Sequence, residues 1–155
     1  MFWIIHALVG MILGLTLNSL VLIVVLSFVS HFFIDLIPHW DSYFDNHLFE
    51  KTGKIKIKKR DLIIRLIDIS LTVSFVLFLY FRFNNILLIL GSFSSVLPDM
   101  IKGGYITKLK SNKIYFNYLK FHSKIQGKAS MIVGLVIQII FFLMLNFILL
   151  RLLTV

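Results

Sequence analysis

Five long apolar runs dominate this sequence and limit what it can fold into. They cover residues 2–16, 19–37, 62–82, 85–100 and 129–150. Hydrophobic side chains make up 59% of the 155 residues, more than one soluble core of this size can bury. Since a helix needs ~20 residues to cross a bilayer, the runs predict an all-α, polytopic membrane protein. We expect one domain, residues 1–155, with about five short transmembrane helices.

Short polar breaks join the runs into hairpins. Asn18-Ser19 and Asn84-Asn85 are expected to form tight turns, because Asn and Ser favour turn conformations. The runs 2–16 and 85–100 are shorter than a full span, so each is expected to cross only in part or to tilt locally. Gly10 and Gly14 form a small-xxx-small pair that lets another helix approach closely, although two glycines in an apolar helix need have no such role.

The positive charge is concentrated in two stretches, 38–61 and 101–128, with Arg65 counted with the first. The chain carries 16 Lys and Arg against 7 Asp and Glu, a formal net charge of +9. Such an excess can indicate nucleic-acid binding, but basic loops beside apolar runs are what the positive-inside rule produces. If each run crosses once, both basic loops and the N-terminus lie in the cytoplasm. We therefore predict an inner-membrane protein with no nucleic-acid partner.

Cysteine is missing from the sequence, which restricts the chemistry open to it. Without a thiol there is no disulfide, no thiolate nucleophile and no Cys-ligated zinc or iron–sulfur site. Any metal must therefore be held by imidazole and carboxylate groups.

His31 and Asp35 form the strongest candidate site. They are four residues apart and share one face of the second helix, a spacing that presents two ligands to one ion. An ionisable side chain in a bilayer costs on the order of 3 kcal/mol, so each one kept there needs a partner or a role. Pro38 is expected to end this helix, which turns His39 and Asp41 back over its end. A buried ion pair between His31 and Asp35 is the competing interpretation.

The remaining candidates are predicted to reach the same membrane face. Pro98 is expected to end the fourth helix and turn Asp99 back in the same way. His6 and Asp68 lie near the cytoplasmic ends of the first and third helices, and His122 immediately precedes the fifth. The predicted topology depends on Lys and Arg alone, yet it brings these potential ligands to the same depth in the membrane. Taken singly, His6 or Asp68 is also explained by a hydrogen bond between helices.

Mixed His and Asp ligands suit zinc, manganese or iron. The candidates exceed the needs of one tetrahedral ion, so one or two divalent ions are expected, zinc before manganese. Two ions ~3.5 to 4 Å apart activate a water and clamp both oxygens of a phosphoester. Asp41 and Asp68 are candidates for a catalytic base or for support of the ligands.

Residues 105–121 mix aromatic side chains with lysines and predict an interfacial helix. Its cations suit anionic lipid or a phosphate-bearing substrate. A simple interfacial anchor is the alternative.

Four short motifs occur in order along the chain: IIHALVG at 4–10, HFFIDLIPHWD at 31–41, VLPDM at 96–100 and FHSKIQ at 121–126. In these motifs the chain resembles the small inner-membrane metal-dependent hydrolases known as YdjM-like or LexA-binding proteins, and more distantly the helical zinc-dependent phospholipases C. The resemblance implies metal ligation by His6, His31, Asp35, Asp99 and His122, with His39 and Asp41 nearby. It departs from the family at Pro38-His39-Trp40-Asp41, where a Pro-Asp-x-Asp-His run is usual, and at Phe121-His122-Ser123.

These observations favour a cytoplasm-facing metal-dependent hydrolase acting on a phosphoester or related ester of a lipid-like substrate in the bilayer. No Gly-x-Ser-x-Gly nucleophile elbow and no Gly-rich phosphate loop occur in the sequence. Two alternatives stay open: a divalent-cation carrier that uses the same side chains transiently, and a non-catalytic protein with a structural His and Asp network.

Overall fold

The computed structural model describes residues 1–41, 58–103 and 112–154, and these residues form six helices. The helices are α1 (Trp3–Thr16), α2 (Leu20–Asp35), α4 (Lys59–Phe83), α5 (Ile86–Gly103), α6 (Lys113–Ile125) and α7 (Met131–Thr154). The all-α prediction is confirmed, and five of these helices occupy the five apolar runs. The stretch 101–128, predicted as a loop, contains the end of α5 and all of α6.

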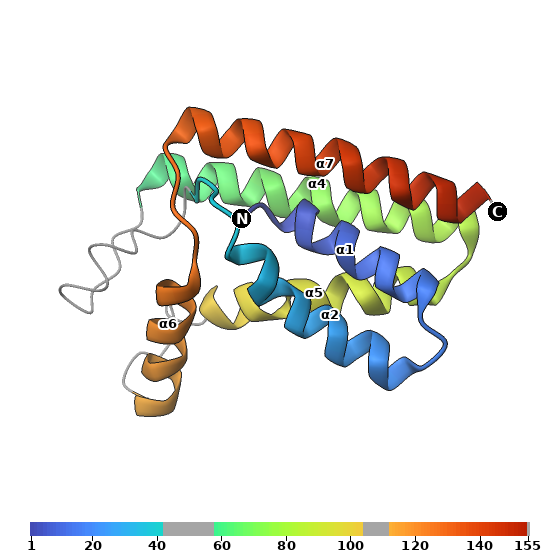
Figure 1. Cartoon of the computed structure of the whole chain (residues 1–155), viewed down its shortest axis with the longest axis horizontal. Coiled ribbons are helices and arrows are strands. Elements are labelled where there is room, and N and C mark those ends of the chain that lie inside the picture. Colours follow the sequence, from blue (N-terminus) through green and yellow to red (C-terminus); the bar gives the residue numbers. More distant parts are fainter. Residues whose placement is uncertain (42–57, 104–111, 155) are drawn as a thin grey trace.

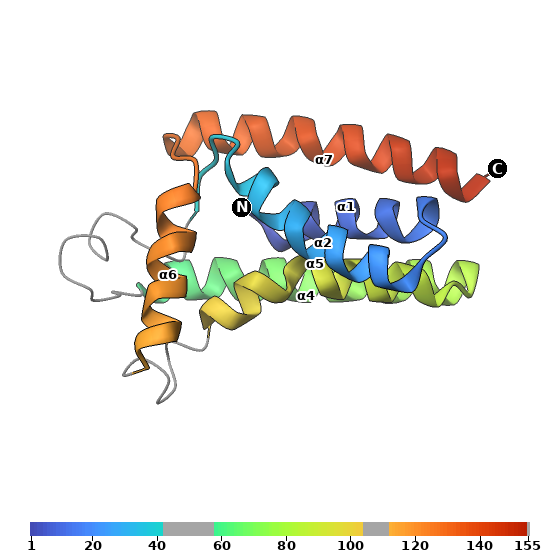
Figure 2. The same cartoon turned by 60° about the horizontal axis from the view of Figure 1, so that its bottom comes forward.

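Helix α1 lies at the centre of the bundle, in contact with α2, α4, α5 and α7. Figures 1 and 2 show these helices along the long axis, whereas α6 lies across one end. The starts of α1, α4 and α7 and the ends of α2 and α5 gather at that same end, which we call the α6 end. The C-terminus lies at the opposite end (Figure 1). The alternating directions of the helices therefore collect residues distant in sequence at the α6 end.

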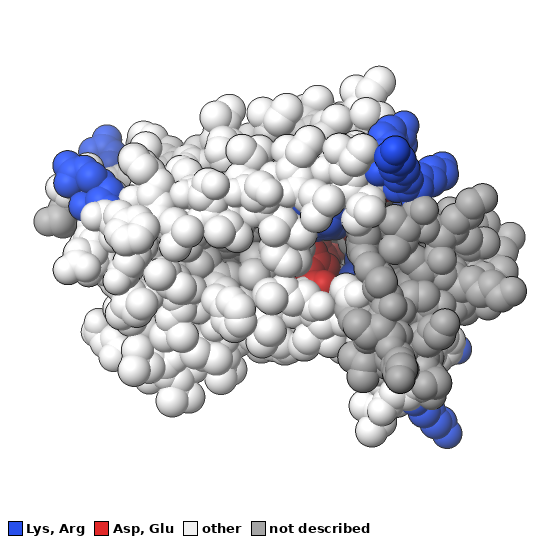
Figure 3. All heavy atoms as spheres, turned by 180° about the vertical axis from the view of Figure 1, so that it is seen from behind, with Lys and Arg blue, Asp and Glu red and all other residues white. Residues whose placement is uncertain are grey.

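The outside of the bundle is apolar, as expected for a protein in lipid. Side chains such as Phe81 and Ile132 are each 77% exposed. In Figure 3 most of the visible Lys and Arg residues lie at the two ends, and the surface between them is uncharged except for acidic and basic atoms in one hollow. Helices α4, α5 and α7, with 25, 18 and 24 residues, are long and apolar enough to cross a membrane. Helices α1 and α2 are shorter apolar helices. The protein is therefore membrane-associated.

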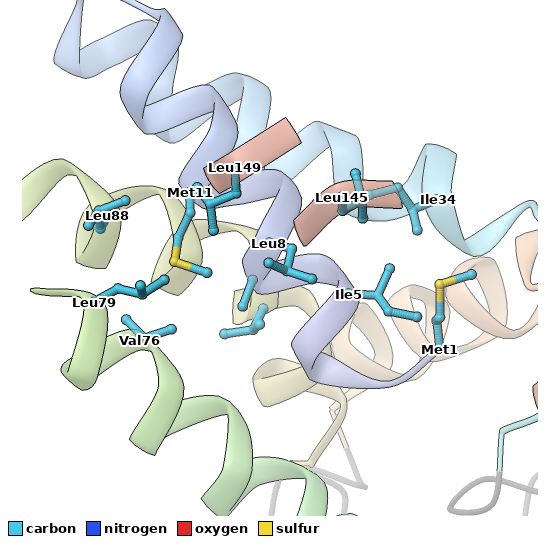
Figure 4. Close-up of a cluster of buried hydrophobic side chains, with 12 residues drawn as sticks. Met1, Ile5, Leu8, Met11, Ile34, Val76, Leu79, Leu88, Leu145 and Leu149 are labelled. Carbon is cyan, nitrogen blue, oxygen red and sulfur yellow. The ribbon is translucent and has the colours of Figure 1, made fainter. Parts of the chain in front are cut away.

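One face of α1 supplies the centre of the hydrophobic core. Ile5, Leu8 and Met11 are almost fully buried, and their spacing of three puts them on one side of the helix. Figure 4 shows them between Val76 and Leu79 of α4 and side chains of α5 and α7. This packing fixes α1, and with it His6, against its neighbours.

Helices α1 and α5 cross at glycines. A Cβ atom on Gly10 or on Gly91 would collide with the backbone carbonyl of the other residue, and one on Gly14 would collide with the carbonyl of Leu87. The close-approach interpretation of Gly10 and Gly14 is confirmed, because only a residue without a side chain fits here. The crossing brings α5 close to the centre of the bundle along the length of α1.

The turns at the far end from α6 follow the predicted chemistry. Ser19 precedes α2 and accepts a hydrogen bond from the backbone N–H of Leu22 at 3.5 Å. Asn84 ends α4 with φ of 48°, the left-handed conformation that Asn tolerates, and its N–H donates to Tyr80. Both turns reverse the chain and return α2 and α5 to the α6 end.

The two prolines behave differently. Pro38 follows α2, which ends at Asp35, as predicted. Pro98 was predicted to end the fourth helix, and this is wrong: it lies inside α5, which continues to Gly103. A proline within a helix is tolerated where neighbouring groups take up the backbone carbonyls that it releases. Asp99 therefore comes from within a helix and not from a turn.

Candidate metal centre

Four buried side chains at the α6 end form a compact group. His31 and Asp35 come from α2, Asp99 from α5 and His122 from α6, and each offers one ligand atom within 4.8 Å of the other three. Their side chains are between 0% and 4% exposed. This group of N and O donors can hold a metal ion.

The spacing of the donor atoms fits a tetrahedral ion. His31 Nε2 lies 3.1 Å from His122 Nε2 and 3.3 Å from Asp35 Oδ2. His122 Nε2 lies 3.7 Å from both Asp35 Oδ2 and Asp99 Oδ1, and His31 Nε2 lies 3.9 Å from Asp99 Oδ1. Zinc bonds of this kind place ligand atoms about 3.3 to 3.6 Å apart in a tetrahedron. These five distances, 3.1 to 3.9 Å, lie on both sides of that range, and all four donor atoms are within 4.8 Å of one another, so the group would have to contract around an ion.

Helix α5 fixes the tautomer of His31. The ring Nδ1 lies 2.8 Å from the carbonyl oxygen of Ser95. A carbonyl only accepts, so Nδ1 carries the proton and Nε2 presents its lone pair to the other ligands. Pro98 has no N–H to donate to the carbonyl of Ser94, and its ring disturbs this turn of α5, in which the Ser95 carbonyl turns to His31. The unexpected proline within α5 thus helps to orient a ligand.

His39 is oriented in a similar way. Its Nδ1 donates to the carbonyl of Ile37 at 2.7 Å, which leaves Nε2 as the acceptor. Burial, with the nearby amino nitrogen of Met1, lowers the pKa of His39 to about 4. Burial and the charge of Lys102 lower the pKa of His122 to about 3. Both imidazoles are therefore neutral at pH 7, the state in which histidine binds metal.

Asp35 joins this group to a second set of donors. Its Oδ2 faces His31 and His122, whereas its Oδ1 lies 3.3 Å from His6 Nε2 and 3.7 Å from His39 Nε2. The nitrogen of Met1 also lies 3.2 Å from Oδ1. The same nitrogen lies 2.7 Å from His39 Nε2, so the Met1 amino group already provides a cation to this second set of donors.

The imidazole ring of His6 is stacked on that of His31, a member of the four-residue group. The rings of His6 and His31 lie 4.0 Å apart, centroid to centroid, and 20° from parallel. Both ring nitrogens of His6 are buried and make no hydrogen bond among the described residues. The same holds for Asp35 Oδ2 and His122 Nδ1. Buried polar atoms without partners are costly, so the residues fit a cation that would satisfy His6 and Asp35.

Asp41 and Asp68 lie beside the ligands but are held by other groups. Asp41 Oδ1 accepts from Arg65 at 2.9 Å, and Asp41 Oδ2 accepts from Gln126 at 2.8 Å. Asp68 accepts from the backbone N–H groups of Trp3 and Ile4 and so caps the start of α1. These contacts favour a supporting role, and the assignment of either residue as a base stays a prediction.

Two buried cations, Arg65 and Lys102, complete the centre. The prediction that both belong to the basic loops is wrong, because both lie in helices. Arg65 lies in α4 and reaches Asp68 and Asp99 at 3.5 Å; Lys102 lies in α5 and reaches Asp41 at 3.3 Å and Asp99 at 3.9 Å. Each is three residues from an aspartate on its own helix, a spacing that signals neighbours on one helix face. This i, i+3 spacing is the sequence feature from which the two ion pairs could have been predicted.

Helix α6 brings His122 to the other ligands. The hydroxyl of Tyr118 donates to the carbonyl of Pro98 at 2.7 Å, and that of Tyr115 donates to the carbonyls of Ile101 and Lys102 at 3.0 Å each. The aromatic residues of the predicted interfacial helix thus dock α6 on the end of α5. Residues 105–111 of that prediction lie outside the described part of the chain.

Replacing Pro98 by alanine is expected to weaken metal binding about tenfold without removing a ligand, the usual cost of losing an outer partner. The alanine N–H can bond to the carbonyl of Ser94, four residues back, and the straightened turn is expected to draw the neighbouring Ser95 carbonyl away from His31 Nδ1. Competition with a chelator for zinc measures the change. Ser94→Ala is the matched control, because the Ser94 hydroxyl bonds only to Leu90 among the described contacts. Equal affinity in the P98A protein and wild type would show that Pro98 does not orient His31.

Comparisons with known proteins add no family to this picture. No protein-family model, no curated protein and no solved structure matches the chain. The functional conclusion therefore rests on the geometry of the His and Asp group.

Proposed function

We propose that this protein is a membrane-embedded, metal-dependent hydrolase that cleaves a phosphoester or related ester in a lipid-like substrate. One observation carries the proposal: Asp99 belongs to the four-ligand group and also lines a cavity of about 330 Å³ together with Arg65 and Lys102. An ion held by all four side chains would be closed, as structural ions normally are, whereas a catalytic ion keeps one position open. We therefore propose that His31, Asp35 and His122 hold the ion, and that Asp99, which also contacts Arg65 and Lys102, lies beside the open position at the cavity. A substrate in the cavity can therefore reach the ion beside Asp99.

The donor set favours zinc, with manganese as the alternative. Two imidazoles and two carboxylates, His31, His122, Asp35 and Asp99, are ligands that zinc accepts in tetrahedral sites. A second ion would use Asp35 Oδ1 with His6 and His39, and would have to displace the Met1 amino group from Asp35 and His39. Bound at the centre, a divalent ion supplies an acidified water and polarises the phosphoryl oxygen.

The reaction follows from the groups around the cavity. A water oxygen attacks phosphorus, the bond from phosphorus to the leaving oxygen breaks, and a proton from the water ends on that leaving oxygen. Arg65 and Lys102 are placed to hold the phosphate oxygens, as cations do in phosphoryl-transfer sites. Asp41 contacts Arg65 at 2.9 Å and Lys102 at 3.3 Å, and Asp68 also contacts Arg65, at 3.5 Å. Asp41 is our candidate for the group that receives the proton in transit.

We propose five membrane crossings in a cytoplasmic membrane, with the N-terminus and the centre facing the cytoplasm. The alternating directions of α1, α2, α4, α5 and α7 support this count (Figure 1). The basic residues of α6 and the start of α4 lie at the α6 end, and the positive-inside rule assigns that end to the cytoplasm. Membrane thinning or tilt would accommodate the shorter α1 and α2. The motif resemblance to YdjM-like hydrolases is consistent with this placement.

A cation carrier is less well supported. Carriers need polar groups along the whole path through the membrane. In the described residues, the His and Asp side chains that contact one another are confined to the α6 end, and the buried residues toward the other end, such as Leu79, Leu88 and Leu149, are apolar. The arrangement favours chemistry at one face over transport.

The test is hydrolysis by purified protein in mixed micelles. We expect zinc- or manganese-loaded protein to release phosphate from a lipid phosphoester such as hexadecyl phosphate, and the Asp99→Asn variant to lose that activity. Ser94→Ala, on the same helix, is the matched control. Metal-loaded protein that releases no phosphate or alcohol above the micelle blank, from either phosphate monoesters or diesters, would refute the hydrolase assignment.

A further inference from the structure

We infer that a groove between α4 and α5 holds one hydrocarbon chain. The molecule bound there is then a single-chain lipid with a phosphate at the end of its chain. The inference rests on the proposed function for the fate of the phosphate, but the groove and its occupant are tested separately. It narrows the substrate from lipid-like molecules in general to one architecture.

Two cavities form the groove and share a boundary. The first, about 330 Å³, contains Arg65, Asp99 and Lys102. The second, about 420 Å³, runs on between α4 and α5. Trp3, Ile69 and Met100 line both, so the two cavities adjoin. Figure 3 shows the hollow in the uncharged face of the bundle, with acidic and basic side chains at its base.

The second cavity is lined almost entirely by apolar side chains. They include Val73, Val76, Leu77, Ile89 and Phe93. It also contains two hydroxyls, but each donates to its own helix: Thr72 to the carbonyl of Asp68 at 2.7 Å and Ser92 to that of Ile89 at 3.0 Å. Of the described residues that line this cavity, only Trp3, at the boundary with the first cavity, brings a further donor, its indole N–H. The rest of the wall offers a bound molecule apolar contact, which suits an alkyl or prenyl chain.

The first cavity has the opposite character. Arg65 and Lys102 are buried cations at its wall, and both contact Asp99 of the metal-ligand group. A phosphate here would share these cations with Asp41, Asp68 and Asp99, and Arg binds phosphate with a planar pair of donors. The charge at one end and the hydrocarbon at the other fix the orientation of an amphiphile. Its phosphate lies at the ligand group and its chain runs toward the membrane centre.

The length of the groove indicates a long chain. The lining residues of α4 extend from Leu62 to Leu77, which is about 22 Å along a helix at 1.5 Å per residue. Since α4 is long enough to cross a membrane, the groove opens at the depth where lipid chains lie. A lipid can therefore enter sideways from the bilayer without exposing its chain to water.

The first experiment is photo-crosslinking with a hexadecyl phosphate that carries a diazirine on its chain. We expect the label to map to α4 and α5 in wild-type protein in micelles. Val73 is 49% exposed and lines the groove, so Val73→Trp fills it without disturbing the core. Val133 is 53% exposed on α7, away from the groove, so Val133→Trp is the matched control. We expect V73W to reduce crosslinking about tenfold, because losing the apolar contacts of about two methylene groups weakens binding by about that factor. V133W should leave crosslinking unchanged.

The second experiment separates the groove from the chemistry. In metal-loaded protein, V73W should lower hydrolysis of hexadecyl phosphate but not of the short, soluble butyl phosphate. Crosslinking in the groove without hydrolysis of any ester would refute the proposed function and leave the lipid site standing. Hydrolysis of both esters that is equal in V73W, V133W and wild type, with label spread over α2 and α7, would overturn the groove inference alone.

Discussion

Replacing His31 and Asp35 together by alanine is expected to abolish metal binding. Purified wild-type protein should carry one or more equivalents of a divalent metal by inductively coupled plasma mass spectrometry, and the double variant should carry none above background. The pair supplies two of the four donors of the compact group, and Asp35 also faces His6 and His39 through its other oxygen. Losing both residues therefore removes ligands from either possible ion position.

The control for this experiment must remove polar groups without touching the ligands. Ser94→Ala with Asn146→Ala does so, since each side chain donates to a carbonyl of its own helix, Ser94 to Leu90 and Asn146 to Phe142. Both double variants should elute as single species in detergent with unchanged helical circular dichroism. Substoichiometric metal in wild type, even after reconstitution with zinc and with manganese, would exclude the hydrolase and leave a structural polar network.

The convergence of the ligands could be predicted from sequence because it depends on coarse features. Apolar runs fix where the helices lie, and turn residues such as Asn84 fix where the chain reverses. His6, His31, Asp35 and Asp99 then reach one end of the bundle whatever the details of packing. That end is where the structure brings them together with His122.

The finer features depend on packing that sequence does not specify. Pro98 predicts a helix end, but α5 continues past it, and His31 and Tyr118 from two other helices contact the carbonyls of Ser95 and Pro98 in this part of α5. Arg65 and Lys102 read as loop charges because basic residues near a membrane face are normally solvated. Their burial follows from the carboxylates that surround them, which come from α4, from α5 and from the segment after α2. No pattern in the sequence indicates the contact of Gln126 with Asp41.

Removing the charge of Arg65 is expected to cause the largest loss of stability of any single substitution considered. Arg65 contacts Asp41 at 2.9 Å and both Asp68 and Asp99 at 3.5 Å, with its side chain 8% exposed. Arg65→Met keeps much of the volume but leaves buried carboxylates without this partner, which costs about 3–5 kcal/mol. Thermal unfolding in detergent, followed by loss of the monodisperse species, measures the change. Arg82→Met, at the exposed end of the same helix, should cost less than about 0.5 kcal/mol.

The same variant links the cation cluster to the metal. A divalent ion at the ligand group would offset the charge of Asp99, so the loss caused by R65M should be smaller in zinc-loaded than in metal-free protein. Binding to the folded state also stabilises it by mass action, which R82M controls for. If R65M destabilises both forms equally, Asp99 does not face the ion, and the group reduces to His31, Asp35 and His122. If it destabilises neither form, the buried carboxylates are neutral and the proposed phosphate site is lost with them.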